Sequence, residues 1–174
     1  MPSLHVCSLS RLEATVTASG ASHVATLINA GTPVPRPSTI PADNHLFLGF
    51  NDIVEPTAGM ITVGEAEVLR LFDFVDAWSR ERPMVIHCWA GISRSTAGAF
   101  VTACRLMPER AEDDIARELR VKSPSATPNL RLVRIADALM GRGGRMAKAI
   151  EAIGRGRDAF EGVPFVLPIE RAAP

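Results

Sequence analysis

The sequence predicts an α/β fold, a single domain in which helices flank a central sheet of four to five mainly parallel strands. Short apolar runs alternate with amphipathic segments in the first half of the chain, as in strands joined by helices. Beyond residue 95 the pattern is helical to about residue 155. A chain of 174 residues that is 47% hydrophobic and 22% charged can form one sizeable core.

Four apolar runs predict the parallel strands. They cover residues 4–7, 24–28, 45–50 and 84–87. Residues 31–44 hold four prolines and no periodicity, so we expect a surface loop there. We expect residues 1–160 to form the domain and residues 161–174 to be an extended tail, packed on the domain or trailing from it.

The helices are predicted from apolar side chains that recur at steps of three and four residues. They cover residues 10–17, 63–81 and 95–107, and three further segments marked by Ile115 and Leu119, by Leu132, Ala136, Leu139 and Met140, and by Met146, Ile150 and Ile153. The clearest is 63–81, where Thr62 and Glu65 have the spacing of a capping box. Pro83 is expected to end it.

Composition excludes several classes of protein. The 19 basic and 19 acidic side chains give a formal net charge of zero, so we expect neither a nucleic-acid nor a membrane partner. The first residues lack the features of a secretory signal, and three cysteines are too few for a disulfide framework. We therefore expect a cytoplasmic protein, and a monomer. Residues 1–87 carry 5 basic and 9 acidic side chains against 14 and 10 in residues 88–174, a balance of −4 against +4.

Chemistry concentrates between the strand at 84–87 and the helix at 95–107, where the sequence reads His87-Cys-Trp-Ala-Gly-Ile-Ser-Arg-Ser95. Ligands bind at the carboxyl edge of an open α/β sheet, and a turn that ends at a helix N-terminus presents free N–H groups to an anion. Gly91 lets the turn curl, because glycine adopts positive φ at no steric cost. Arg94 adds a planar pair of donors, so the segment is predicted to hold a phosphate.

Cys88 at the base of this turn predicts a nucleophile. A helix N-terminus and a neighbouring guanidinium both favour the thiolate, which is the reactive form of cysteine. Ser95 is placed to donate a hydrogen bond to that sulfur. The alternative for Cys88 is a small buried core side chain, the ordinary fate of a free cysteine. The flanking glycine, arginine and serine favour the catalytic interpretation.

This segment resembles the signature of the cysteine-dependent protein tyrosine phosphatase superfamily, in the form used by its dual-specificity branch. The resemblance covers roughly residues 20 to 140. Asn51-Asp52, which follows a predicted strand, looks like the general-acid loop of that family. Pro128-Asn129 is similar to a pair found before a helix in many dual-specificity members. The resemblance implies a phosphotyrosine protein phosphatase-like fold.

The resemblance also implies a role for each matching residue. Cys88 would form a phosphocysteine intermediate, Asp52 would act as general acid and then as general base, and Ser95 would assist the leaving thiolate. His87 would tune the thiolate through hydrogen bonds. Asn129 would order a loop of the site or cap its own helix. The expected phosphate-binding residues are Trp89, Ala90, Gly91, Ile92, Ser93 and Arg94.

The expected activity is hydrolysis of phosphotyrosine, with phosphoserine and phosphothreonine left open. The substrate would be a phosphorylated protein or a small phosphoester, and inorganic phosphate or a similar oxyanion would occupy the site. No cofactor and no metal are expected. The alternatives are a phosphate-binding module without catalysis, a phosphatase for a non-protein phosphoester, and cysteine redox or sulfur-transfer chemistry.

Three assignments stay open at this point. Asp43, in the proline-rich loop, is the alternative general acid to Asp52. Glu55 is expected to neighbour the acid loop or simply to lie on the surface. Cys7 is expected in the core, with a redox pairing as the alternative, whereas Cys104 is expected to be structural.

Overall fold

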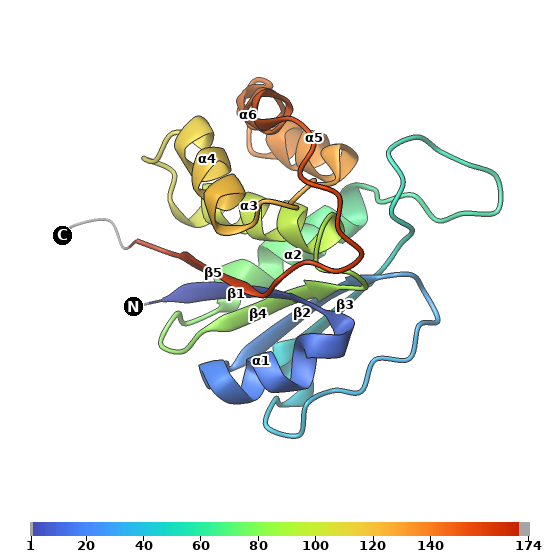
Figure 1. Ribbon diagram of the computed structural model, residues 1–174, viewed down its shortest axis with the longest axis vertical. Coiled ribbons are helices and arrows are strands. Elements are labelled where there is room, and N and C mark those ends of the chain that lie inside the picture. Colours follow the sequence, from blue (N-terminus) through green and yellow to red (C-terminus); the bar gives the residue numbers. More distant parts are fainter. Residues whose placement is uncertain (1, 171–174) are drawn as a thin grey trace.

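A five-stranded sheet forms the centre of the computed structural model, which describes residues 2–170 (Figure 1). Its strands are β1 (Ser3–Ser8), β2 (His23–Ile28), β3 (His45–Gly49), β4 (Met84–Cys88) and β5 (Phe165–Pro168). They lie in the order β3-β2-β4-β1-β5. The first four strands of the chain are parallel, and β5 runs antiparallel to β1. The predicted α/β class and strand number are confirmed.

The helices cover the two faces of the sheet unequally (Figure 1). They are α1 (Leu12–Ser19), α2 (Glu65–Ala77), α3 (Arg94–Leu106), α4 (Glu112–Lys122), α5 (Leu130–Leu139) and α6 (Arg145–Ile153), with short 3₁₀ turns at Leu9–Arg11 and Ala42–Asn44. Only α1 lies on one face, and α2 and α3 cover the other. The remaining three helices pack outside α3.

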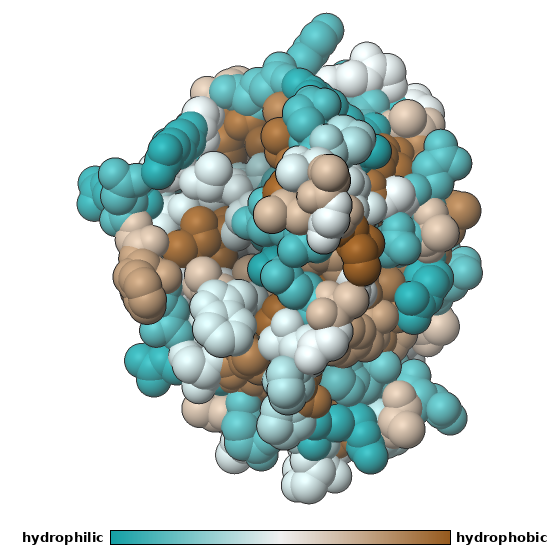
Figure 2. Space-filling view, turned by 90° about the vertical axis from the view of Figure 1, so that its right-hand side faces the viewer, coloured by the Kyte–Doolittle hydropathy of each residue, from teal (hydrophilic) through white to brown (hydrophobic). Residues whose placement is uncertain are grey.

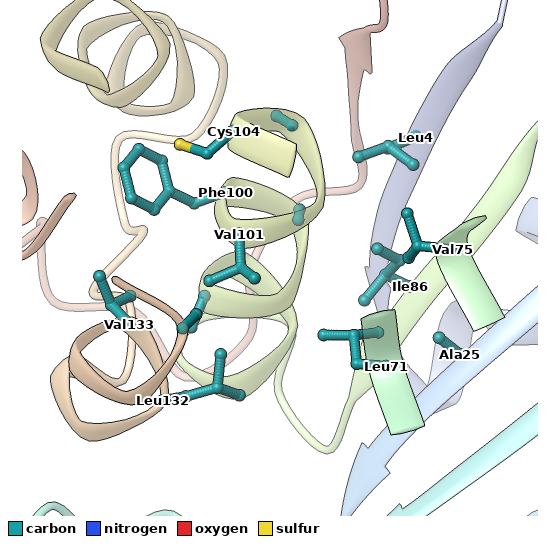
Figure 3. Packing of buried hydrophobic residues seen from close by; sticks show 14 of the residues in the cluster. Leu4, Ala25, Leu71, Val75, Ile86, Phe100, Val101, Cys104, Leu132 and Val133 are labelled. Atoms are coloured by element: carbon teal, nitrogen blue, oxygen red, sulfur yellow. The ribbon is translucent and has the colours of Figure 1, made fainter. Parts of the chain in front are cut away.

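The main core lies between the sheet and α2, α3 and α5 (Figure 3). Leu71 and Val75 of α2 lie against Ile86 of β4, while Val101 of α3 points toward α5. All these side chains are buried. The central strands β2 and β4 are buried on both faces along almost their whole length, which is why they read in the sequence as continuous apolar runs. This core holds α3, and therefore the loop before it, firmly against the sheet.

The structure corrects the ends of the predicted helix at 63–81. Glu67, rather than Glu65, reaches back over the first turn, where its carboxylate accepts a 2.9 Å hydrogen bond from the N–H of Gly64. Val63 is fully buried and its carbonyl accepts from Arg131, which keeps it outside the helix. At the other end Trp78 leaves helical geometry, with ψ of 119°, and its indole N–H donates to the carbonyl of Arg82.

One further expectation meets a different outcome. Leu139 is 36% exposed rather than part of the inner face of its helix, because α5 ends at that residue. Within the segment expected as an extended tail, Phe165–Pro168 forms the edge strand β5, which pairs with β1. Residues 171–174 of that tail lie outside the described residues.

The parallel strands bring the site residues together at one edge. β2, β3 and β4 end at Ile28, Gly49 and Cys88, and parallel strands end on the same side of a sheet. The residues that follow these three strands, Asn29, the segment 50–52 and the loop 89–93, therefore meet there.

Candidate active site

The loop between β4 and α3 curls at Gly91, which has a φ of +72°. Positive φ favours glycine, and space demands it too. A Cβ at this position would lie 2.8 Å from the backbone nitrogen of Ser8 and 2.9 Å from the carbonyl carbon of Cys7. The loop is thus pressed against the end of β1, and its curl at Gly91 is the one that the sequence predicts.

The carbonyl groups of this loop accept hydrogen bonds from the segments around it. The N–H of Leu9 donates to the carbonyl of Trp89, that of Gly162 to Ala90, that of Thr127 to Ile92 and that of Asn129 to Ser93, over 2.8–3.2 Å. Among the described residues, the N–H groups of Ala90, Ile92 and Ser93 have no protein acceptor. The carbonyl oxygens of the loop are thus bonded to the protein, whereas these N–H groups can donate to a ligand. A loop that presents free N–H groups binds anions.

Cys88 ends β4 at the floor of this loop, with 2% of its surface exposed. Its Sγ lies 3.1 Å from Oγ of Ser95 and accepts a 3.2 Å hydrogen bond from the N–H of Gly91. Both contacts suit a thiolate, because a hydroxyl and an amide can each donate to sulfur. The structure therefore brings together Cys88, Gly91 and Ser95 as the sequence predicts.

Arg94 is the first residue of α3 and is 6% exposed. Its Nη1 donates to Oδ1 of Asn29 over 2.6 Å and to the carbonyl of Phe50 over 2.8 Å. Its Nε is buried without a protein partner. No carboxylate among the described residues pairs with this guanidinium. The edge formed by Nε and Nη2 is left for two oxygens of a ligand.

Asp52 lies on the loop after β3 and is joined to the phosphate loop. Its Oδ1 accepts a 2.7 Å hydrogen bond from the hydroxyl of Ser93 and a 2.9 Å bond from Nδ2 of Asn129. Asn129 also caps α5, where its Oδ1 accepts from the N–H of Leu132. Asn129 thus contacts Asp52 and caps its own helix at the same time. Oδ2 of Asp52 makes no protein hydrogen bond within the described range.

His87 is fully buried and does not touch the sulfur of Cys88 through a hydrogen bond. Its Nδ1 lies 3.3 Å from the carbonyl oxygen of Cys88, and its Nε2 lies 2.7 Å from Oγ1 of Thr26. Burial lowers the pKa of His87 from 6.5 to about 4, so the ring is neutral at physiological pH. Because a carbonyl oxygen only accepts, Nδ1 of His87 carries the proton and donates to it, and Nε2 of His87 accepts from the hydroxyl of Thr26. The same hydroxyl oxygen accepts a 2.8 Å hydrogen bond from Nε2 of His45.

A cavity of about 680 Å³ opens above Cys88 and Arg94. Asp52 lines it, and so does Trp89, which is 62% exposed and forms part of the wall. Two lining residues come from a segment that the sequence did not suggest, Ala159 and Phe160. Asn29 was also missed. Neither Asn29 nor the segment with Ala159 and Phe160 lies in a recognisable local motif, because contacts between distant parts of the chain bring them to the site.

The remaining candidates lie away from this cavity. Asp43 precedes β3, at the amino end of the strands and thus opposite to the end that carries Cys88. Cys7 pairs in register with His87, so its thiol and that of Cys88 point to opposite faces of the sheet. Burial raises the pKa of Cys7 to about 11 and that of Cys104 to about 12. Glu55 is exposed beside the Asp52 loop.

Several solved structures with the same fold are phosphatases. DUSP15 matches with 15% identity over 87% of this chain and 92% of its own, at a TM-score of 0.64. PTP-2 phosphatase of Cydia pomonella matches with 19% identity over 78% and 84%, at 0.61. Human DUSP28 matches with 16% identity over 80% and 94%, at 0.59. The chain has the dual-specificity phosphatase fold. No protein-family model and no curated protein sequence matches it.

The dual-specificity phosphatase fold confirms the architecture that the sequence resemblance implies. At identities of 15–19% the likeness establishes the fold alone. No helix of the described chain is long and apolar enough to cross a membrane. Within residues 2–170 no three histidine, cysteine or acidic side chains are grouped as a metal site would require.

Proposed function

We propose that this chain belongs to the dual-specificity branch of the cysteine-dependent protein tyrosine phosphatases. It hydrolyses phosphotyrosine through a phosphocysteine on Cys88. Arg94 and the loop amides bind the phosphoryl oxygens, and Asp52 transfers protons. Ser95 stabilises the leaving thiolate, while His87 and Asn129 position the loop and Asp52.

The observation that carries the proposal is the buried, unpaired charge of Arg94. Burying a guanidinium without a carboxylate costs free energy, and a bound oxyanion would offset that cost. The guanidinium keeps its Nε–Nη2 edge free beside amides that also have no protein acceptor. Cys88 lies at the floor of the same cavity, so an oxyanion held there would present its central atom to sulfur.

The reaction follows in two steps. The Cys88 thiolate attacks phosphorus, the S–P bond forms and the ester O–P bond breaks, while protonated Asp52 gives its proton to the leaving oxygen. In the second step the Asp52 carboxylate takes a proton from water, whose oxygen attacks phosphorus as the S–P bond breaks. The products are the alcohol or phenol and inorganic phosphate, and the thiolate is restored.

Asp52 suits this double role because its two oxygens differ. Oδ1 already accepts hydrogen bonds from Ser93 and Asn129, which fix the carboxyl group. Oδ2 is left to carry the proton in the first step and to receive one in the second. Asp52 is exposed on the cavity wall, where a leaving group and water can both reach it.

Hydrolysis of p-nitrophenyl phosphate by the purified protein tests the proposal. Cys88→Ser is expected to abolish turnover, and Cys104→Ala, at a core cysteine, is the matched control that keeps it. Turnover that survives Cys88→Ser would overturn the mechanism. Binding of tungstate without hydrolysis of any phosphoester would favour a phosphate-binding module, and a persulfide on Cys88 would favour sulfur transfer.

A further inference from the structure

The segment from Gly156 to Gly162 crosses the outside of the phosphate loop and is fixed at both ends. The N–H of Gly156 donates to Oγ1 of Thr127, and that of Gly162 donates to the carbonyl of Ala90 over 2.8 Å. Between them, the Glu161 carboxylate accepts hydrogen bonds from the hydroxyls of Ser8 and Ser10. The segment is therefore held in place although it contains no helix or strand.

Both glycines are places of close backbone approach. A Cβ at Gly156 would lie 2.5 Å from the carbonyl carbon of Ser125, and one at Gly162 would lie 2.6 Å from the carbonyl oxygen of Gly91. Neither neighbouring atom belongs to a flexible side chain, so only glycine fits at either position. The chain thus passes over the catalytic loop at contact distance.

This fixed segment holds Phe160 out into solvent at the mouth of the cavity. Phe160 is 98% exposed, and Trp89 across the same cavity is 62% exposed. Among the described residues they are the only tryptophan or phenylalanine side chains that are exposed. Phe160 contributes almost no burial to folding, and it lines the cavity together with Trp89, as the exposed apolar side chains of a ligand-binding site do. Figure 2 shows this end of the molecule, where hydrophobic side chains reach the surface among hydrophilic ones.

The side chains at the mouth of the cavity limit which substrate group can bind there. With phosphorus against Cys88 at the floor, the esterified group extends toward the mouth of the cavity, whose lining includes Trp89, Phe160 and Met60. Arg94 is the only lysine or arginine that lines this cavity within the described chain. An apolar ring suits the mouth better than a second charged group, because aromatic side chains stack on rings with their faces or edges.

We propose that Phe160 and Trp89 form an aryl-recognition site that makes the enzyme select aryl phosphates over alkyl phosphates. This rests on the proposed function and assigns the side chains that recognise the ring of its substrate. Glu161 is a positioning residue, since it fixes the backbone beside Phe160 and does not line the cavity.

Calorimetric binding of two phosphonates separates ring recognition from catalysis. Phenylphosphonate and methylphosphonate carry the same charged group, and neither is hydrolysed. Phe160→Ala is expected to weaken phenylphosphonate binding about 5- to 10-fold, the size of an aromatic contact, and to leave methylphosphonate binding unchanged. Phe160→Tyr keeps a ring and should retain the preference. Glu161→Ala should reduce it in the same direction.

Val163→Ala is the matched control, because Val163 is 79% exposed one residue beyond the segment and does not line the cavity. Unchanged binding of phenylphosphonate to Phe160→Ala would overturn the inference, and so would an equal loss of affinity for both phosphonates. Either result leaves the proposed function standing if the wild-type protein hydrolyses an aryl phosphate. Wild-type protein that binds neither phosphonate and hydrolyses no phosphoester would instead refute the proposed function.

Discussion

The side chain of Asn129 joins the start of α5 to the carboxylate of Asp52. Its Oδ1 accepts from the N–H of Leu132, and its Nδ2 donates to Oδ1 of Asp52 over 2.9 Å. Its own backbone N–H also donates to the carbonyl of Ser93 on the phosphate loop. One residue therefore links the helix cap, the acid loop and the phosphate loop, so the position of the proposed acid depends on α5.

Asn129→Ser should separate the two functions of this side chain. Serine still caps a helix but cannot reach Asp52, so stability should stay close to that of the wild type while phosphotyrosine hydrolysis falls about 10-fold. Asn129→Ala should show the same loss of activity and about 1 kcal/mol less stability. Unfolding in urea and kcat on a phosphotyrosine peptide measure the two effects. Full activity in Asn129→Ser would show that Asp52 needs no such support.

Asn29→Asp should weaken oxyanion binding. An aspartate here keeps the hydrogen bond to Nη1 of Arg94 but adds a negative charge beside the guanidinium, which lowers its attraction for an anion. We expect the inhibition constant for tungstate to rise about 10-fold, equivalent to ~1.4 kcal/mol. Asn44→Asp, the same charge change at the opposite end of the strands, is the control and should leave inhibition unchanged. Equal effects in both variants would contradict the contact with Arg94.

Ser95→Ala should slow the second chemical step more than the first. Without the hydroxyl 3.1 Å from its sulfur, the leaving thiolate loses a hydrogen bond, and we expect kcat to fall about 10- to 100-fold. Rapid mixing with p-nitrophenyl phosphate should then show a burst of nitrophenol. The wild type, which keeps the Ser95 hydroxyl beside the sulfur, is the comparison and should show a smaller burst. A Ser95→Ala variant that is slow without a burst would place the serine in the first step.

Stability should fall as the pH drops from 6.5 to 4. The pKa of His87 is lowered by burial to about 4, so in this window the unfolded chain binds a proton that the folded chain does not. Linkage then gives full stability above pH 6.5 and a loss of about 3 kcal/mol toward pH 4 from this group. The pKa values of His5, His23 and His45 shift in the same direction.

His87→Gln cannot titrate and should flatten this dependence. Urea unfolding at pH 7 and at pH 4.5 measures it in both proteins, and the carboxyl groups contribute equally to each. The same pH dependence in His87→Gln and wild type would mean that His87 is protonated in the folded chain.

The sequence predicts the part of the site that is local in the chain. A buried strand, a seven-residue turn and a helix start place Cys88, Gly91 and Arg94 within one short segment, and periodicity marks each element. Asp52 can be predicted for a similar reason, because it closely follows a strand that must end at the same edge of the sheet as the strand before Cys88.

The rest of the site depends on contacts between distant segments. Asn29 differs in no local feature from any asparagine after a strand, and only the strand order brings it to Arg94. Phe160 lies in an irregular segment that two glycines and a glutamate fix by contacts with residues far away in the chain. The capping box at Thr62 was wrong for a related reason, since burial of Val63 delays the start of α2.

The covalent state of Cys88 during turnover tests the central claim most directly. Wild-type protein mixed with an aryl phosphate and quenched in acid within milliseconds should yield an S-phosphorylated peptide that contains Cys88, identified by mass spectrometry. Asp52→Asn should still form it with a good leaving group, and its breakdown should be slow. Turnover with no phosphate on Cys88 in either protein, or with phosphate on another residue, would contradict the account.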